Sequence, residues 1–325
     1  MEVDEVAALI RRGETLLLAG DEGPLRRLPN GRWIAGTIPY FMSEEGGVVD
    51  RRRLFVEQLP RELECAGVRR YGEDDVARVY ADLPAGGLGI MIAPYASEVH
   101  LSFAVNAPRY EKFATAPLFG WISGVHLSDV GRARPKVLDG TTGEALDQQA
   151  AVMQVLLPPG KAAELGILNI FEKGNGPDIS FPSTGFVATA AEIDGRTRNF
   201  AEYIEQSALD TRLPLVADYF GARINVSFQG VDAARREVRF YGPVFTGVHY
   251  HHARPVADYV DAFVSALPQG LGGRIVFSCN CILNFVHSSL EGRSTGDIVG
   301  PATFGEIAYQ LLNQTMVYVT ISDLR

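Results

Sequence analysis

The pattern of apolar and polar positions in the first half of the chain alternates between a helical period and short apolar runs. Val6, Ala7 and Ile10 share one face of a helix that Gly13 ends. The same pattern predicts further helices at 72–83 and 107–117, and strands at 15–20, 31–42, 87–94, 118–124 and 148–160. Gly36 and Pro39 interrupt the strand at 31–42. Helices that alternate with strands predict an α/β layer domain.

The second half shows the same mixture. It predicts helices at 199–209, 213–221 and 255–268, and strands at 164–174, 185–195, 223–230, 236–242, 245–253, 274–279 and 315–321. We expect the strand at 315–321 to lie centrally beside 274–279, because both runs are continuously apolar. Pro158, Pro159 and Gly160 mark a domain boundary. The sequence therefore predicts an α/β (α+β) fold with two related mixed-sheet domains, at 1–158 and 159–325.

Composition and charge narrow the functional classes. Hydrophobic residues make up 46% and charged residues 21% of the 325 residues, so the chain can bury a large core. The net charge of -9 argues against a nucleic-acid partner, which needs phosphate neutralisation. The acidic start "MEVDEVAALI" is unlike a signal peptide, no run approaches the ~18 apolar residues of a membrane span, and three cysteines do not make a disulfide framework. We expect a cytoplasmic protein that needs no cofactor and has no membrane partner.

Cys279 and Cys281 are the first chemical candidates, in the stretch "FSCNCILN". A thiol becomes a nucleophile only as a thiolate, which needs a cation or a helix N-terminus nearby. Arg274 is the nearest cation in the sequence, and His287 could act as a base. A buried structural thiol at a strand end is the alternative, and free cysteines often take that role. The pattern favours the structural role for Cys279.

The histidines of "GVHYHHARP" are the second candidate. On a strand, His249 and His251 point to one side and His252 to the other. Two imidazoles at this spacing can hold zinc or iron, but no third ligand stands nearby in the sequence. We predict that His249 and His251 bind no metal.

The third candidate is "GPATFGEIAY". Gly300 and Gly305 allow the backbone to come close to a ligand or a neighbouring strand. Glu306 follows directly, and its carboxylate either binds a ligand ammonium group or satisfies backbone amides. The residues leave both roles open.

Several segments together resemble the FIST family, the sensory domains of F-box and intracellular signal-transduction proteins. The similar segments are Phe277-Ser278-Cys279, Gly300, Phe304-Gly305-Glu306-Ile307 and Asn313-Gln314-Thr315-Met316-Val317. "ATAAEIDGR" and "INVSFQGVDAARREVRFYGPVFTG" are similar to family strands before them, and "RWIAGT" and "APLFGWISGVHLSD" are more loosely similar to its N-terminal part. The resemblance covers most of the chain, with its strongest part after residue 180.

The resemblance implies a stand-alone ligand-binding sensor without catalysis. Its ligand would be a small polar molecule, such as an amino acid, and its output an unidentified partner protein. The ligand-binding wall would contain Cys279, Asn280, Asn284, Gly300, Gly305 and Glu306, together with Gly36 and Thr37. The alternative is a thiol-dependent hydrolase or transferase that uses Cys279 or Cys281 with His287 or Glu306.

Overall fold

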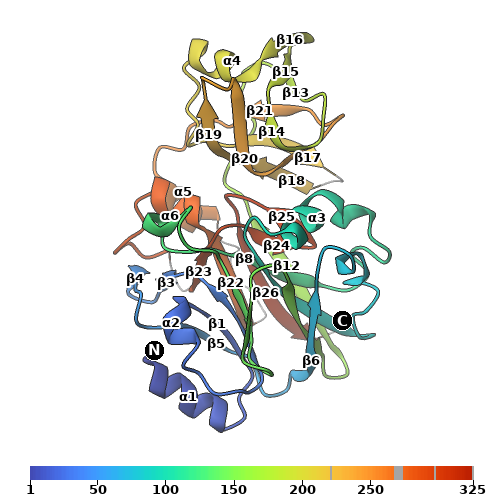
Figure 1. The fold of residues 1–325 in the computed structure, drawn as a ribbon, viewed down its shortest axis with the longest axis vertical. Coiled ribbons are helices and arrows are strands. Elements are labelled where there is room, and N and C mark those ends of the chain that lie inside the picture. The colour runs from blue at the N-terminus through green and yellow to red at the C-terminus, as the bar shows by residue number, and fades with distance from the viewer. Residues whose placement is uncertain (220–221, 267–273, 296–297, 324–325) are drawn as a thin grey trace.

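The computed structural model describes residues 1–219, 222–266, 274–295 and 298–323. Strands dominate, and short helices cover or connect them (Figure 1). The sheets combine parallel and antiparallel pairs, so the predicted mixed α/β fold is confirmed. The molecule has a body, which contains both ends of the described chain, and a separate lobe at the top of Figure 1.

Three sheets build the body. The first has the order β10-β9-β2-β1-β5, with β1 at Leu16–Gly20, β2 at Trp33–Thr37, β5 at Phe55–Gln58, β9 at Val137–Asp139 and β10 at Glu144–Leu146. The second has the order β25-β24-β8-β7-β11-β6, with β6 at Glu64–Tyr71, β7 at Gly87–Pro94, β8 at Leu118–Ser123, β11 at Ala150–Leu156, β24 at Glu306–Ala308 and β25 at Gln310–Leu312. The third has the order β12-β26-β22-β23-β3-β4, with β3 at Tyr40–Ser43, β4 at Gly46–Val49, β12 at Lys161–Leu168, β22 at Arg274–Cys281, β23 at Gly300–Thr303 and β26 at Met316–Asp323.

Two of these sheets combine strands from both halves of the sequence. In the second sheet β24 pairs with β8, and in the third sheet β23 pairs with β3. The predicted boundary at 158–160 coincides with a turn between β11 and β12, but hydrogen bonding between strands crosses that division. The last strand, β26, lies between β12 and β22, so its predicted central position beside 274–279 is confirmed.

The lobe comprises residues 171–219 and 222–253 and contains two further sheets. One has the order β16-β15-β13-β21-β17-β18, with β13 at Ile179–Ser180, β15 at Ala190–Ile193, β16 at Arg196–Asn199, β17 at Leu215–Tyr219, β18 at Ala222–Val226 and β21 at Tyr250–His252. The other has the order β14-β20-β19, with β14 at Gly185–Ala188, β19 at Phe228–Asp232 and β20 at Glu237–Val244. The chain enters and leaves side by side, where Lys173 and Ala253 form an antiparallel bridge. The lobe is therefore an insertion between β12 and the next helix of the body.

The helices follow local signals in the sequence. They are α1 at Val3–Arg11, α2 at Glu22–Leu25, α3 at Glu98–Asn106, α4 at Phe200–Gln206, α5 at Tyr259–Ala266 and α6 at Ile282–His287. A reciprocal pair of hydrogen bonds between Glu2 and the third helical residue, Glu5, starts α1. Ser97 caps α3 by accepting a hydrogen bond from the amide of His100, and Asn199 caps α4 in the same way.

Three predicted helices are wrong. Residues 213–221 contain strand β17 instead, since a short apolar run does not distinguish a strand from a helix. Residues 107–117 contain only a 3-10 turn at Ala107–Arg109, because the helix lies just before them and Pro108 follows its end. Residues 72–83 contain only the 3-10 turn Val76–Arg78. The predicted strand at 245–253 is present as β21, Tyr250–His252, which pairs with β13 and β17.

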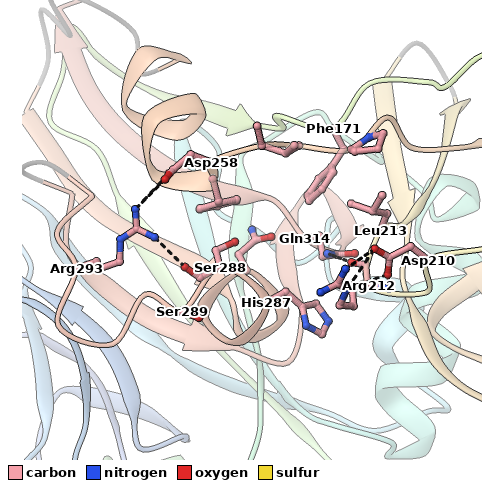
Figure 2. Close-up of a pocket in the computed structure, with 15 residues that line it drawn as sticks. Phe171, Asp210, Arg212, Leu213, Asp258, His287, Ser288, Ser289, Arg293 and Gln314 are labelled. Atoms are coloured by element: carbon pink, nitrogen blue, oxygen red, sulfur yellow. Dashed lines mark hydrogen bonds and ion pairs between the residues drawn. The ribbon is translucent and has the colours of Figure 1, made fainter.

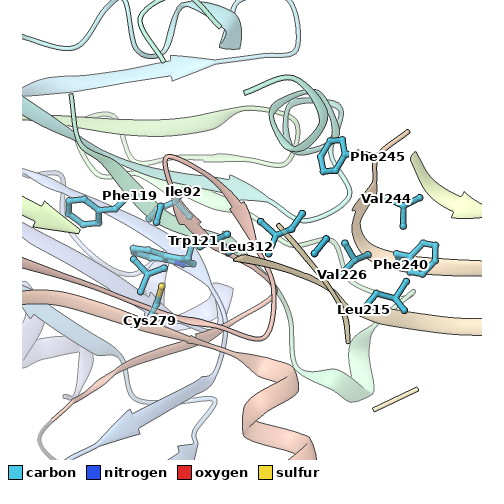
Figure 3. Packing of buried hydrophobic residues seen from close by; sticks show 14 of the residues in the cluster. Ile92, Phe119, Trp121, Leu215, Val226, Phe240, Val244, Phe245, Cys279 and Leu312 are labelled. Carbon is cyan, nitrogen blue, oxygen red and sulfur yellow. The ribbon is translucent and has the colours of Figure 1, made fainter. Parts of the chain in front are cut away.

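One large apolar cluster continues from the body into the lobe (Figure 3). In the body, Trp121 of β8 stacks on Phe277 of β22 with ring centroids 5.2 Å apart. Leu312 lies between this part of the cluster and the lobe, where Val226 and Phe240 continue it. Apolar side chains of the lobe and the body are thus buried against each other, and the removal of their surface from water stabilises the attachment of the lobe.

Candidate functional site

A cleft of about 360 Å³ opens where the lobe meets the body. Its size lies within the range of small-molecule sites, about 300–1,000 Å³. The lobe contributes Phe171, Asp210, Arg212 and Leu213, and the body contributes the residues before and at the start of α5, the end of α6 and the β25–β26 turn (Figure 2). The body residues that line it are Pro255, Val256, Ala257, Asp258, Tyr259, Asn284, His287, Ser288, Ser289, Arg293 and Gln314.

Two arginine–aspartate pairs occupy opposite ends of the cleft in Figure 2. On the lobe side, Arg212 Nη2 lies 2.7 Å from Asp210 Oδ2, and the hydrogen bond from Arg212 lowers the pKa of Asp210 to about 2. On the body side, Arg293 Nη2 lies 3.2 Å from both carboxylate oxygens of Asp258. The pKa of Asp258 is lowered, first by a backbone hydrogen bond from Asp261. Both aspartates are therefore ionised at neutral pH, and their charges balance those of the arginines.

His287 lies between these pairs, on the last turn of α6. Burial lowers its pKa, and the charge of Arg212 lowers it further. The imidazole is therefore neutral at pH 7, with one nitrogen that can donate and one that can accept a hydrogen bond. The cleft consequently combines balanced charge with neutral polar groups.

Asn284 is the one residue of the predicted ligand-binding wall that lines this cleft. Its side chain is 1% exposed, and its Nδ2 donates to Asn280 Oδ1 at 3.0 Å and to the carbonyl of Thr315 at 3.5 Å. Its Oδ1 has no hydrogen-bond partner among the described residues. A buried acceptor without a partner costs about 1–3 kcal/mol, and because this oxygen has almost no exposed surface, a ligand in the cleft would reach it only after the side chain rotates.

Three other predicted residues lie at a second, much smaller cavity. Cys279, Asn280 and Gly300 line a space of about 10 Å³. That is room for about one water molecule. The resemblance implied an amino-acid-sized ligand against these residues, which is larger than this cavity, and that contact stays a prediction. They are core residues next to the cleft, since Asn280 holds Asn284 in place.

Glu306 lies on β24, is fully buried and lines neither the cleft nor this small cavity. Its Oε2 accepts hydrogen bonds from the Thr315 hydroxyl at 2.8 Å and from the Thr315 amide at 3.2 Å. Burial raises its pKa to about 8, although these hydrogen bonds and one from Cys281 oppose the rise. Of the two roles left open, the contacts support the structural one: Glu306 fixes the β25–β26 turn, which carries Gln314 into the cleft.

Gly36, Thr37 and Gly305 also lie away from the described cavities. The Thr37 hydroxyl donates to the carbonyl of Gly124 at 2.7 Å and accepts from the amide of Lys136 at 2.8 Å. A Cβ at Gly36 would lie 2.6 Å from Trp121 Nε1, so glycine is needed there for packing between sheets. The carbonyl of Gly305 accepts the amide of Ile122 at 2.8 Å. Each of the three has a structural explanation, and their predicted ligand contacts stay predictions.

The cysteines have properties opposite to those of a nucleophile. Cys279 and Cys281 are each 1% exposed, and burial raises both pKa values well above the usual range of a thiol. The negative charge of Glu306 raises them further. His287, the proposed base, lines the cleft, and neither cysteine does. The geometry therefore gives the thiol-dependent alternative no support.

The structure places the carboxylate of Asp178 beside His249 and His251, a neighbour that the sequence pattern did not indicate. His249 Nδ1 lies 2.7 Å from Asp178 Oδ1, and His251 Nε2 lies 3.9 Å from Asp178 Oδ2. Nevertheless, the described part of the chain contains no group of three or more side chains placed to hold a metal ion. That His249 and His251 bind no metal stays a prediction.

Sequence reasoning missed most of the cleft. Asp210, Arg212, Asp258 and Arg293 carry its charges, and none of them stands in a recognisable motif. They come from three separate segments, around 210–212, 258 and 293, which lie close together only in the folded chain. The one available signal was Asn284, seven residues before "EGR" in the loop that carries Arg293.

No helix of the described chain is long and apolar enough to cross a bilayer. The chain belongs to a family of unknown function, DUF6976, whose model matches residues 1–322. No curated protein and no solved structure matches it. The family match assigns no activity and does not bear on the resemblance to FIST domains, which stays a prediction.

Proposed function

We propose that this protein binds a small polar molecule in the cleft between lobe and body. The observation that carries the proposal is the unpartnered Oδ1 of Asn284, a buried acceptor in the wall of a cleft of about 360 Å³. A ligand that donates an N–H or O–H group to this oxygen would satisfy it. We thus keep the ligand-binding role that the FIST resemblance implied, but we propose that the ligand binds in the cleft rather than against Cys279 and its neighbours.

The charges of the cleft favour a polar ligand without large net charge. Arg212 and Arg293 offer N–H donors at the two ends, and Asp210 and Asp258 offer acceptors beside them. A zwitterion or a neutral polar molecule fits this balance, whereas a polyanion would meet both carboxylates. The amino-acid-like ligand that the resemblance implied belongs to this class.

Ligand binding here would connect the lobe to the body, because each contributes one arginine–aspartate pair. Closure of two units around a ligand changes the surface that they present to other molecules. We therefore place the output in a partner protein that distinguishes the ligand-bound arrangement from the free one. This completes a sensory role of the FIST type.

A thermal-shift screen with amino acids, small carboxylates and polar neutral compounds tests the proposal. A ligand at about 100 times its dissociation constant adds about 2.7 kcal/mol of stability. We expect at least one compound to raise the melting temperature of the wild type and to lose that effect in Asn284→Leu. Because Asn284→Leu also removes two internal hydrogen bonds, Arg293→Gln serves as a second, more exposed variant, and Arg235→Gln in the lobe serves as its control. A shift of equal size in all four proteins would place the ligand elsewhere.

A further inference from the structure

A separate cavity of about 510 Å³ lies on the body, at the carboxyl ends of two parallel strands. Strands β7 and β8 run parallel, and the cavity is lined by Tyr95, Ala96 and Ser97 after β7 and by Val125 after β8. Ligands of open α/β sheets bind outside the carboxyl ends of such strands. None of its lining residues belongs to the lobe–body cleft.

One side of this cavity is apolar. The residues that form it are Tyr95, Val125, Val130, Pro135 and Phe304. The ring of Phe304 meets that of Tyr95 edge to face, with centroids 5.3 Å apart, and Phe304 is only 5% exposed. Aromatic walls of this kind bury the apolar body of a small ligand and fix its orientation.

The other side carries a positive charge. Among the residues that line the cavity, Arg132 and Arg134 are opposed only by Asp147, although the whole chain has a net charge of -9. Arg134 Nη1 lies 3.4 Å from Asp147 Oδ2, a long contact that leaves other N–H donors of the guanidinium available. Arg132 donates to the carbonyl of Ser128 and lies 3.9 Å from Asp129. An anionic group in the cavity could therefore bind either arginine.

The turn between β7 and α3 contributes Ala96 and Ser97 to the floor of the cavity, and its own hydrogen bonds fix its shape. Ala96 has φ of 60°, a left-handed conformation that is uncommon outside glycine. Its amide donates to His100 Nδ1 at 3.2 Å, and the Ser97 hydroxyl donates to the carbonyl of Pro94 at 2.6 Å. Strained turns that the surroundings hold in place cluster at ligand sites. The floor of the cavity is thus formed before any ligand arrives.

From the apolar wall, the two arginines and the position at the strand ends, we propose a second binding site here. Its ligand is a small molecule with an apolar body and one anionic group, a carboxylate or a phosphate. This ligand class differs from that of the charge-balanced cleft, and the site does not depend on the function proposed for the cleft.

Calorimetric titration of the full chain with phenylacetate and with phenyl phosphate tests the site, with the neutral amide phenylacetamide as the matched probe. We expect one of the two anions to bind with a dissociation constant in the millimolar range or lower. Phenylacetamide should bind at least about tenfold more weakly, because it cannot form the charged hydrogen bond to an arginine. The anion that binds better identifies the group that the arginines select.

Two surface variants locate the binding. Arg134→Gln removes a positive charge that would attract the anion. Val130→Glu adds a negative charge that would repel it, at a residue that is 50% exposed. Each should weaken the anion at least about tenfold, as expected when a charged hydrogen bond is lost. The controls Arg235→Gln and Val187→Glu alter comparably exposed residues of the lobe and should leave affinity unchanged. The proposal is overturned if neither anion binds, if phenylacetamide binds equally well, or if the controls weaken binding as much as the cavity variants.

Discussion

Glu306 is a buried carboxyl group whose ionisation the fold controls strongly. It is fully buried, no basic side chain lies among its hydrogen-bond partners, and its pKa is raised to about 8. A carboxyl group in that state stays protonated in the folded protein at pH values where it ionises in the unfolded chain. The folded state therefore binds more protons than the unfolded state between the ordinary pKa of 4.5 and about 8.

The first prediction follows from that difference. The stability that Glu306 contributes is fully present below its ordinary pKa and is lost as pH rises toward 8, by up to ~1.4 kcal/mol per pH unit. Glu306→Gln keeps an acceptor for Thr315 and removes the ionisation. We expect the free energy of unfolding of the variant, relative to wild type, to rise between pH 5 and pH 8 in urea titrations. A difference that is the same at both pH values would contradict the buried, neutral carboxyl group.

Thiol reactivity gives a second prediction at this scale. Cys65 is partly exposed, whereas Cys279 and Cys281 are buried with strongly raised pKa values. A neutral-pH alkylating reagent should therefore modify Cys65 first, and the other two only when the protein unfolds. Mass spectrometry of timed samples measures the order. Rapid labelling of Cys279 or Cys281 in the native protein would revive the thiol-dependent alternative.

The sequence identified some of these residues but not their arrangement. The burial of Cys279 follows from the apolar strand that it ends, and the structure confirms it. The separation of Asn284 from Cys279 does not follow, because it depends on the direction in which α6 leaves β22. The meeting of the two charged pairs in one cleft could not be predicted either, since Asp210 and Arg212 lie far along the chain from Asp258 and Arg293.

At the scale of elements, strands were predicted better than helices. Apolar runs such as β8 and β26 were predicted correctly, because short runs rich in β-branched and aromatic residues favour buried strands. The run that forms β17 predicts a helix by its pattern, but its length and composition suit either element, and pairing with β18 and β21 makes it a strand. Pairing partners such as β24 with β8 lie far apart along the chain, so no local pattern contains them.

Gly300 tests the close approach of β22 and β23. A Cβ at this position would lie 2.0 Å from the carbonyl oxygen of Ser278, so the strands would have to separate. We expect Gly300→Ala to lower the free energy of unfolding by about 2 kcal/mol or more. Gly230→Ala is the matched control, because no atom lies within 4 Å of its Cβ position. Equal effects of the two substitutions in urea unfolding would show that β23 does not pair with β22 as described.

At the scale of the whole molecule, the lobe is held to the body by a buried polar junction as well as by the apolar cluster. Asn225 of β18 donates to the carbonyls of Asn313 and Gln314 at 3.1 and 3.2 Å. The Ser227 hydroxyl donates to Gln314 Oε1 at 2.7 Å, and Gln314 Nε2 donates to the carbonyl of Arg212 at 3.1 Å. The β25–β26 turn is therefore both the junction and one wall of the cleft.

This junction leads to a further prediction. Asn225→Ala removes the donor and leaves two buried carbonyls with one partner fewer, at a cost of about 1–3 kcal/mol. We expect hydrogen exchange to accelerate in β17 and β18 and at the β25–β26 turn, while β7 and β11 in the body stay protected. Uniform acceleration throughout the chain would mean that lobe and body do not open separately from each other.

The central claim is that a small polar molecule binds between lobe and body and donates to Asn284. Isothermal titration of the most stabilising compound of the thermal screen into wild type, Asn284→Leu, Arg293→Gln and the control Arg235→Gln tests it most directly. We predict one ligand per chain and an affinity that each cleft variant lowers at least about tenfold, as expected for the loss of a charged or buried hydrogen bond. The control should bind as the wild type does. Equal affinity in all four proteins, or no measurable binding to the wild type, would contradict the account.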